Sequence, residues 1–318
     1  MTRLSDDKTG ILISAAGAAP SMHNTQPWRF EVAGGAVDVM LDADRALPAE
    51  DPAGRLVRIG LGAAGFNLRV AAAMLGYDAR YAVAPDPERR DIVVRVFLGE
   101  RRAPAALSEL YPQVHRRHTY RGPMLELHVP PAVRGAVGAA VRHEGGELTW
   151  LTGASRERLL GVVLEAEVLD GYDEDRRDER ARWIGGGGRR RDGVPAAALG
   201  PRPASRPAPH RDLDPDGPDR GTAAFEPDPQ LAVLSTPSDG PEAWVVAGMA
   251  LQHGLLEATS YDVSASFVNQ PVEHTETRRY LRELADPAAN PQLVIRFGYP
   301  AAAAGHAPRR AWQELMED

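Results

Sequence analysis

The chain has 318 residues, of which 43% are apolar and 25% charged, and its net charge is −7. This globular composition suits one large domain or two smaller ones, and the acidic balance argues against a nucleic-acid-binding protein. No cysteine is present, which excludes disulfides, thiolate catalysis and cysteine-bound metal centres. Lys8 is the only lysine, so lysine Schiff-base chemistry is disfavoured and arginine supplies the remaining positive charge.

The sequence offers no targeting or membrane-spanning segment. No uninterrupted apolar run reaches the length that crosses a bilayer. The apolar stretch 11–19 imitates a signal-peptide core, but it follows Asp6 and Asp7, where a signal peptide needs basic residues. We therefore predict a cytoplasmic protein that is not bound to a membrane.

The first half alternates helical and strand-like patterns. The patterns predict helices over residues 9–18 and 55–75, and strands over 29–33, 37–42, 77–84 and 91–98. The helix over 55–75 is apolar nearly all round and rich in glycine and alanine. We expect it to be buried, with close backbone contacts to a neighbour.

The second half repeats this mixture on a larger scale. The patterns predict strands over 148–152, 230–235 and 292–297, and helices over 105–114, 131–142, 155–182, 242–261 and 278–284. The second half therefore also mixes helices with short strands.

Residues 185–221 differ from the rest of the chain. They contain four consecutive glycines, three consecutive arginines and many prolines, so they cannot form a long regular element. A long irregular segment inside a compact domain is usually a lid or a disordered loop. Because folded patterns lie on both sides, we favour a mobile lid over a linker.

The two halves echo each other. The first long helix ends in Leu75-Gly76-Tyr77-Asp78 and is followed by the strand Ile92–Val96. The second long helix ends in Thr259-Ser260-Tyr261-Asp262 and is followed by Leu293–Phe297. We therefore expect an internal duplication, with one half over residues 1–102 and the other over 103–318.

The most distinctive local motif is the loop over residues 19–30. Two prolines, Pro20 and Pro27, bracket short hydrogen-bonding side chains that include Ser21, Asn24 and Gln26. A rigid loop of this kind presents donors and acceptors of the sort that a flavin ring needs. From composition alone, a helix cap followed by a polar turn is an equally good interpretation.

The string from Pro20 to Phe30, P-S-M-H-N-T-Q-P-W-R-F, resembles the P-S-x-x-N-x-Q-P-W-x-F signature of nitroreductase-like flavoproteins. The resemblance implies an α+β fold in which FMN binds where two halves meet, between a Pro-Ser loop and a basic phosphate-binding cluster. It implies that Pro20, Ser21, Met22, Asn24 and Gln26 contact the cofactor.

A match to the basic cluster lies in the second half, at Arg117-His118-Thr119-Tyr120-Arg121. If this segment is extended, Arg117, Thr119 and Arg121 share one face, since strand side chains alternate. Two guanidinium groups beside a hydroxyl suit a phosphate dianion. Without the resemblance, a solvent-exposed basic turn is the better interpretation of this segment.

Two further segments continue the resemblance. Residues 291–299, P-Q-L-V-I-R-F-G-Y, look like the family's last strand, and Arg309 and Arg310 follow where the family places another phosphate-binding arginine. Residues 266–271, S-F-V-N-Q-P, match a flavin-flanking region more loosely and add Asn269 and Gln270 as expected cofactor contacts. There, an ordinary helix-to-strand loop is an equally good interpretation.

The Pro-Ser loop occurs only in the first half and the basic cluster only in the second. One chain should therefore form one complete site and bind one FMN, as a monomer that mimics the family's dimer and can dimerise further. This arrangement resembles the Acg-type branch, in which two fused nitroreductase-like halves and a covering loop share one chain.

The resemblance implies a ping-pong oxidoreductase that passes hydride from NAD(P)H through FMN to a small organic acceptor, nitro or quinone-like. The flavin carries the chemistry, so no side chain is assigned as a catalytic acid or base. The alternative is a non-catalytic protein that stores FMN beneath its lid. Phosphate-loop, nucleophile-elbow and zinc-protease motifs are absent, and no metal is expected. A pure interaction protein remains a lesser alternative.

Overall fold

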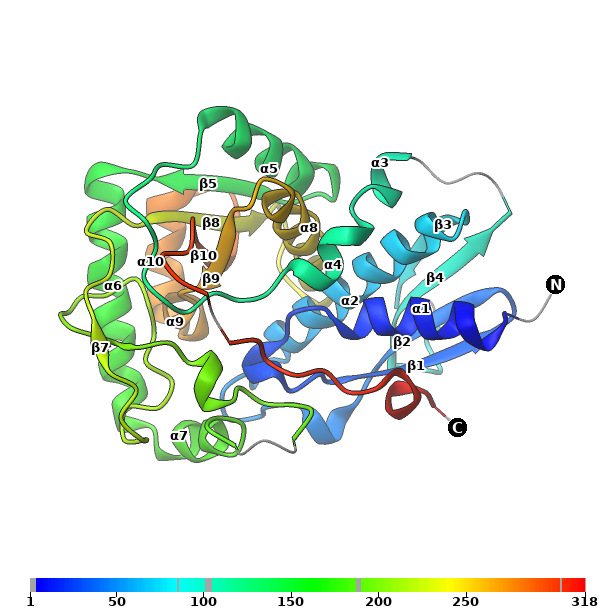
Figure 1. The fold of residues 1–318 in the computed structure, drawn as a ribbon, viewed down its shortest axis with the longest axis horizontal. Helices are drawn as coiled ribbons and strands as arrows, with labels where there is room; N and C mark the ends of the chain where they lie inside the picture. The colour runs from blue at the N-terminus through cyan, green and yellow to red at the C-terminus, as the bar shows by residue number, and fades with distance from the viewer. Residues whose placement is uncertain (1–3, 85, 101–104, 187–189, 304, 318) are drawn as a thin grey trace.

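The computed structural model describes residues 4–84, 86–100, 105–186, 190–303 and 305–317. These residues form a mixed α/β fold with two antiparallel four-stranded sheets, one in each half of the chain (Figure 1). The first half consists of α1 (Asp6–Gly17), β1 (Trp28–Ala33), β2 (Ala36–Leu41), α2 (Arg55–Met74), β3 (Asp78–Val83) and β4 (Ile92–Gly99). The short helices α3 (Ala105–Ser108) and α4 (Tyr111–Arg116) lead to the second half.

The second half has the same core elements with additions between them. Its helices are α5 (Pro131–His143), α6 (Gly153–Tyr172), α7 (Glu174–Ala181), α8 (Pro241–Ser260), α9 (Gln270–Glu273) and α10 (Thr275–Ala285). Its strands are β5 (Glu147–Leu151), β6 (Arg202–Pro203), β7 (Thr222–Ala223), β8 (Gln230–Thr236), β9 (Ser264–Phe267) and β10 (Asn290–Gly298). Short 3₁₀ turns lie at Met22–Asn24, Ala43–Arg45, Ala196–Ala198 and Trp312–Leu315.

The two large sheets have the same topology. The first has the strand order β1-β2-β4-β3 and the second β5-β8-β10-β9. When the strands of each sheet are matched in chain order, these two orders are identical. In both halves a 20-residue helix, α2 or α8, connects the second strand to the third.

Helices α2 and α8 cross at backbone contact in the centre of the molecule. A Cβ atom on Gly62 would lie 2.1 Å from the Val245 carbonyl oxygen, and one on Gly248 would lie 2.0 Å from the Ile59 carbonyl oxygen. Each glycine is the eighth residue of its helix, and each contacts the fifth residue of the other. The contact is therefore nearly twofold symmetric, and only glycine fits at its centre.

The expected burial of the first long helix is confirmed. Helix α2 is long and apolar enough to pass for a membrane span, but 89% of its most apolar window is buried inside the fold. Its apolar residues pack against α1, the first sheet and α8, which makes it a core helix.

Two segments connect the two halves. Residues 117–124 run from α4 to the second sheet, where Thr119 pairs with Ala265 and Met124 with Pro300. The C-terminal segment returns to the first half, where Met316 pairs with Phe30 (Figure 1). The C-terminal segment therefore ties the end of the chain to the first sheet.

The predicted elements agree with most of the structure apart from their ends. The helix expected over 105–114 is divided into α3 and α4, and the helix expected over 155–182 is divided into α6 and α7. The sequence patterns do not predict the short elements β6, β7, β9 and α9. Residues 190–221 form no regular element longer than three residues, as their composition predicts. The proposed boundary at residues 102 and 103 lies outside the described residues.

Candidate functional site

Two adjoining cavities lie where the two halves meet. The first, called here the inner cavity, contains about 830 Å³ of space free of atoms, part of it open to solvent. The second, called the arginine cavity, contains about 650 Å³. Both values lie in the range typical of small-molecule sites. Pro20, Ser21, Thr119 and Arg121 line both cavities, so these residues form a wall that the two cavities share.

The Pro-Ser loop is strained and tightly held. His23, Asn24 and Gln26 have φ values of 47°, 56° and 50°, which residues other than glycine rarely adopt. The Ser21 hydroxyl accepts a hydrogen bond from the Gln26 amide at 3.0 Å. The Asn24 amide donates to the carbonyl oxygens of Gly193 and Pro308, both at 2.9 Å. Strain that the surroundings hold in place in this way is typical of functional sites.

Helix α2 lies close to the Pro-Ser loop, and together they form one wall of the inner cavity. A Cβ atom on Gly60 would lie 3.4 Å from the Pro20 carbonyl oxygen. The neighbouring side chains Leu56 and Ile59 also line the cavity. The loop is therefore pressed against an apolar helical surface.

The arginine cavity contains three arginines without a carboxylate partner. Among the described residues, no Asp or Glu oxygen lies within 4.0 Å of the guanidinium groups of Arg117, Arg121 or Arg309. Arg117 donates to the Ala18 carbonyl oxygen at 3.1 Å and Arg121 to that of Ala198 at 3.2 Å. The buried Nε atoms of Arg117 and Arg309 have no hydrogen-bond partner in the part of the chain that the structure describes.

Burial and mutual repulsion disfavour the charges of these arginines. Burial, followed by the charges of Arg309 and Arg121, lowers the pKa of Arg117 to about 9. Burial also lowers the pKa values of Arg121 and Arg309 to about 10. A buried cationic cluster with unsatisfied N–H groups is suited to binding an anion.

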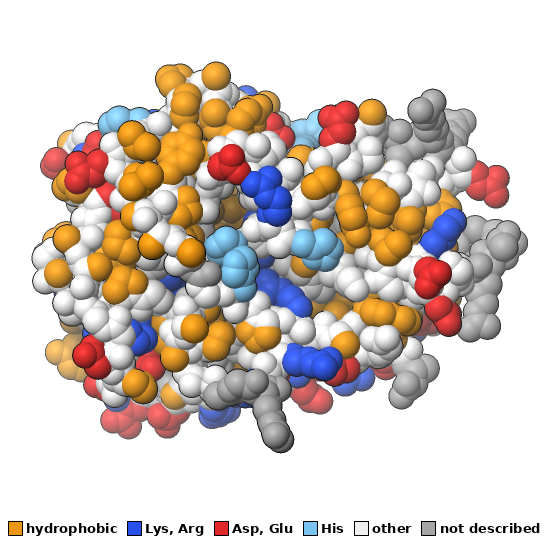
Figure 2. Space-filling view, viewed as in Figure 1, with side chains coloured by type: hydrophobic (Ala, Val, Ile, Leu, Met, Phe, Trp, Pro, Cys, Tyr) orange, Lys and Arg blue, Asp and Glu red, His pale blue; other side chains and the backbone are white. Residues whose placement is uncertain are grey.

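Residues 117–121 are expected to be extended, and two of them, Thr119 and Tyr120, pair with a strand of the second sheet. The Tyr120 amide donates to the Ala265 carbonyl oxygen at 2.9 Å. Arg117, Thr119 and Arg121 all line the arginine cavity, as the alternation of strand side chains predicts. His118 and His306 also line it, with ring centroids 4.1 Å apart. Figure 2 shows histidine and arginine side chains gathered in the hollow near the centre of this face.

A second set of buried arginines lies on the opposite side of the inner cavity. We call it the paired network, because every arginine in it contacts carboxylates. Arg180 lies 2.6 Å from Glu50, and Arg176 lies 3.1 Å from Asp170 and 2.8 Å from Glu273.

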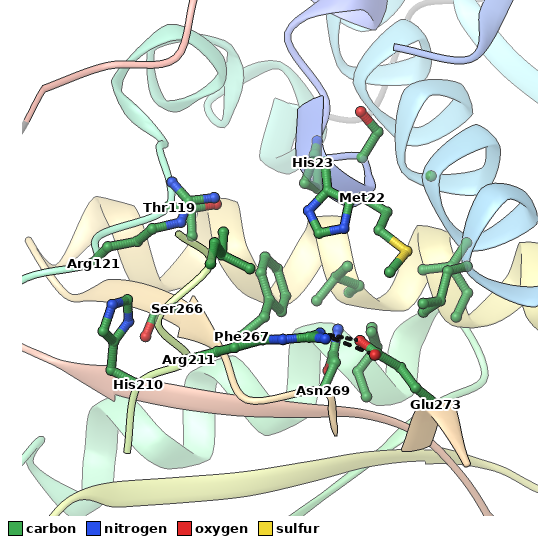
Figure 3. A pocket seen from close by; sticks show the side chains of 18 residues that line it. Met22, His23, Thr119, Arg121, His210, Arg211, Ser266, Phe267, Asn269 and Glu273 are labelled. Carbon is green, nitrogen blue, oxygen red and sulfur yellow. Dashed lines mark hydrogen bonds and ion pairs between the residues drawn. The ribbon is translucent and has the colours of Figure 1, made fainter. Parts of the chain in front are cut away.

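The paired network also joins the loops around the inner cavity. Arg211, from the irregular segment, contacts Asp170 and lies 2.9 Å from Glu273 (Figure 3). His23, from the Pro-Ser loop, contacts Glu50. Burial by itself raises the pKa of Glu50, but His23 and the nearby arginines outweigh it and hold the pKa at about 2.

Most of the residues expected to bind cofactor line one of the two cavities. They are Pro20, Ser21, Met22, Asn24, Arg117, Thr119, Arg121, Asn269 and Arg309. Ser21 and Arg117 line the same cavity, so one mononucleotide can contact both the loop and the cluster. No group of three or more metal-ligating side chains occurs among the described residues.

Three of the expected residues do not line either cavity. The Gln26 side chain accepts from the Arg310 amide at 2.9 Å and donates to the Arg191 carbonyl oxygen at 2.8 Å. The Arg310 guanidinium donates to the Glu314 carbonyl oxygen. Gln270 is buried, and its amide contacts Glu167 at 3.4 Å. Gln26 and Arg310 therefore join the Pro-Ser loop to the C-terminal segment.

Sequence patterns missed several residues that line the inner cavity. His210, Arg211 and Leu213 come from the irregular segment. Ser266 and Phe267, from β9, lie in the loosely matching segment 266–271 but were not assigned as cofactor contacts (Figure 3). The composition of the irregular segment indicated a covering loop but not which of its side chains face the cavity.

No family model matches the chain. A Mycobacterium tuberculosis (H37Rv) protein named "Putative NAD(P)H nitroreductase Rv3131" is 28% identical over 309 residues, covering 96% of this chain and 89% of the relative. From the same strain, "Putative NAD(P)H nitroreductase acg" is 26% identical over 307 residues, covering 93% and 90%.

Solved structures align less completely. The FMN-dependent nitroreductase NfnB from Mycobacterium smegmatis, solved in complex with NADPH, aligns with a TM-score of 0.44 at 16% identity. The alignment covers 67% of this chain and 99% of that one. The full-length relatives support the nitroreductase-like resemblance that the motifs indicate.

Proposed function

We propose that the chain is an FMN-binding oxidoreductase of the nitroreductase type, with NAD(P)H as electron donor and a small organic molecule as acceptor. The observation that carries this proposal is the arginine cavity, in which unpaired arginines adjoin a second, largely apolar cavity. The names of the full-length relatives favour the same activity.

The residues present fit FMN. Arg117, Arg121 and Arg309 line the arginine cavity and have no carboxylate partner among the described residues, which suits a phosphate dianion. Ser21 and Thr119 line both cavities and add hydroxyl groups between the two ends. The inner cavity has apolar walls from α2 and α8, with a few polar side chains, which suits a flat aromatic ring system.

We infer that one chain takes the place of the family's dimer through internal duplication. The identical strand orders and the symmetric contact of Gly62 and Gly248 support this inference. The first half, residues 1–102, would supply the Pro-Ser loop, and the second, residues 103–318, the arginine cluster.

The same symmetry explains why one FMN is expected per chain. In the twofold relation between α2 and α8, Val246 occupies the position equivalent to Gly60. The turn at Gly145 then occupies the position equivalent to Ser21, since a Cβ atom on Gly145 would lie 3.3 Å from Val246. Near this position Arg69 pairs with Glu144 at 2.6 Å, and the Phe66 and His253 rings stack at 4.8 Å. Protein side chains therefore fill the place of a second site.

Bound FMN supplies hydride transfer, and the side chains of the chain position it. Arg117 and Arg309 would hold the phosphate, and Pro20 and Ser21 would form one wall for the ring. Arg121 places a buried positive charge beside the inner cavity, where it would stabilise negative charge on a reduced ring. Residues 210–213 would act as the lid that excludes water.

FMN storage is a second candidate function, favoured by one observation. Arg211 anchors the irregular segment through ion pairs with Asp170 and Glu273, which holds that segment against the inner cavity. A lid held in this way would keep NAD(P)H away from the ring.

Anaerobic addition of NADH and of NADPH to the yellow holoprotein separates the two functions. We expect the flavin absorbance to bleach with at least one of them. If the protein stays yellow while FMN remains tightly bound, storage replaces catalysis. If the purified chain binds no flavin, neither function holds.

A further inference from the structure

His210 is a buried side chain whose chemistry the fold leaves unused. It lies in the irregular segment, is 4% exposed and lines the inner cavity. Its Nε2 atom is buried and has no hydrogen-bond partner among the described residues. An unpaired buried nitrogen destabilises a fold, so such a group usually meets a ligand or water.

The orientation and the charge state of this imidazole are both set by its surroundings. The ring stacks on Phe225 with centroids 5.2 Å apart and planes 8° apart. Burial, followed by the charges of Arg296 and Arg121, lowers the pKa of His210 to about 3. The ring is therefore neutral at physiological pH and offers one donor and one acceptor.

The polar side chains around His210 lie together at one end of the cavity. Figure 3 shows Thr119, Arg121 and Ser266 near His210, whereas Met22 and Glu273 lie at the other end. Helix α2 contributes the apolar side chains Leu56 and Ile59. A flavin ring has a matching asymmetry, because its uracil edge carries two carbonyl oxygens and one N–H, whereas its dimethylbenzene end is apolar.

Resting on the proposed function, we propose that the imidazole of His210 hydrogen-bonds the uracil edge of the flavin ring. The irregular segment thus provides a cofactor ligand as well as a cover. Arg211, the next residue, anchors the same segment to Asp170 and Glu273, so the imidazole is held in place before the ring binds.

Titration of the apoprotein with riboflavin and with FMN tests this contact. Riboflavin lacks the phosphate, so its affinity reports the ring contacts alone. We expect His210→Leu to weaken both ligands by about tenfold, the effect of losing one buried hydrogen bond. His210→Gln should restore most of the affinity, since an amide also donates and accepts.

Two control variants separate ring contacts from other effects. His128→Leu alters an exposed histidine, with a side chain 71% exposed, and should change neither affinity. Arg117→Ala should weaken FMN much more than riboflavin. In the His210 variants the flavin absorption bands should also shift, a change that loss of packing alone would not produce.

Three results would overturn the inference. Equal riboflavin affinity and unchanged flavin bands in wild type and His210→Leu would remove His210 from the ring site while leaving the proposed function intact. A loss that His210→Gln does not restore would assign His210 to packing. Failure of the wild-type chain to bind either flavin would overturn the proposed function, and this contact with it.

Discussion

Two clusters of arginines flank the inner cavity, and they differ in their counter-charges. In the paired network, Arg176, Arg180 and Arg211 contact the carboxylates of Glu50, Asp170 and Glu273. In the arginine cavity, Arg117, Arg121 and Arg309 contact only backbone carbonyl groups among the described residues. Arg117 and the arginines of the paired network are buried, whereas Arg121 and Arg309 are partly exposed. The clearest difference between the clusters is charge compensation.

The pKa values move in opposite directions for this reason. Burial lowers the pKa of Arg211, but Glu273, Asp170 and Glu50 outweigh burial and raise it above its usual value. Burial and two like charges lower the pKa of Arg117 to about 9. The paired network therefore compensates its charges within the fold, whereas the arginine cavity is arranged to gain its counter-charge from an anionic ligand.

Removal of two guanidinium groups from the arginine cavity should have the largest effect. We expect Arg117→Ala combined with Arg309→Ala to weaken FMN binding on the order of a thousandfold, because charged hydrogen bonds contribute about 1.5–3 kcal/mol each. Flavin fluorescence titration measures the change.

Riboflavin affinity should change little in the double variant, since riboflavin carries no phosphate. Arg116→Ala is the matched control, because Arg116 precedes Arg117 but is exposed and pairs with Asp262. Unchanged FMN affinity in the double variant would contradict the phosphate assignment.

The two clusters should differ next in their effect on folding. We expect Arg211→Met to lower the free energy of unfolding of the apoprotein by about 3 kcal/mol, because it leaves buried carboxylates without a partner. Arg117→Met should leave the free energy of unfolding unchanged or raise it, since the substitution removes like-charge repulsion. Urea denaturation compares the two, and equal losses would refute the distinction.

Acid should weaken the paired network through Glu50. Its folded pKa of about 2 lies below its ordinary value of 4.5. The resulting stabilisation is fully present above pH 4.5 and is lost as the pH falls through 2. Between pH 6 and pH 3 we expect the stability difference between wild type and Glu50→Gln to shrink by about 2 kcal/mol. Urea denaturation at the two pH values checks this, and a constant difference would contradict it.

Inorganic phosphate should produce the smallest effect. At millimolar concentration it should stabilise the wild-type apoprotein by about 1 kcal/mol, through binding to the folded state alone. Thermal unfolding measures this stabilisation, and the control is the same protein in sodium chloride of equal ionic strength. The Arg117→Ala, Arg309→Ala double variant should not respond, and an equal response would place the anion elsewhere.

The sequence predicts those parts of the site that depend on local geometry. The Pro-Ser loop carries its polar residues within one short segment, and the alternation over Arg117, Thr119 and Arg121 requires only an extended chain. Both segments line the cavities as expected. The two long helices were also predicted, because each has a continuous apolar pattern.

The remaining residues depend on contacts distant in sequence. His210 lies in a segment without periodicity, and the ion pairs of Arg211 with Asp170 and Glu273 fix its position. Strand β9 has only four residues, so its pattern is too short to recognise. Gln26 carries the expected motif, but its side chain bonds the Arg310 amide instead of lining a cavity.

The central claim is that the two halves of one chain build one flavin site. Titration of the apoprotein with FMN, followed through the flavin absorption bands, tests it most directly. We predict saturation at one FMN per chain, with riboflavin binding at the same stoichiometry but more weakly. Saturation at two FMN per chain, or no binding at all, would contradict this account.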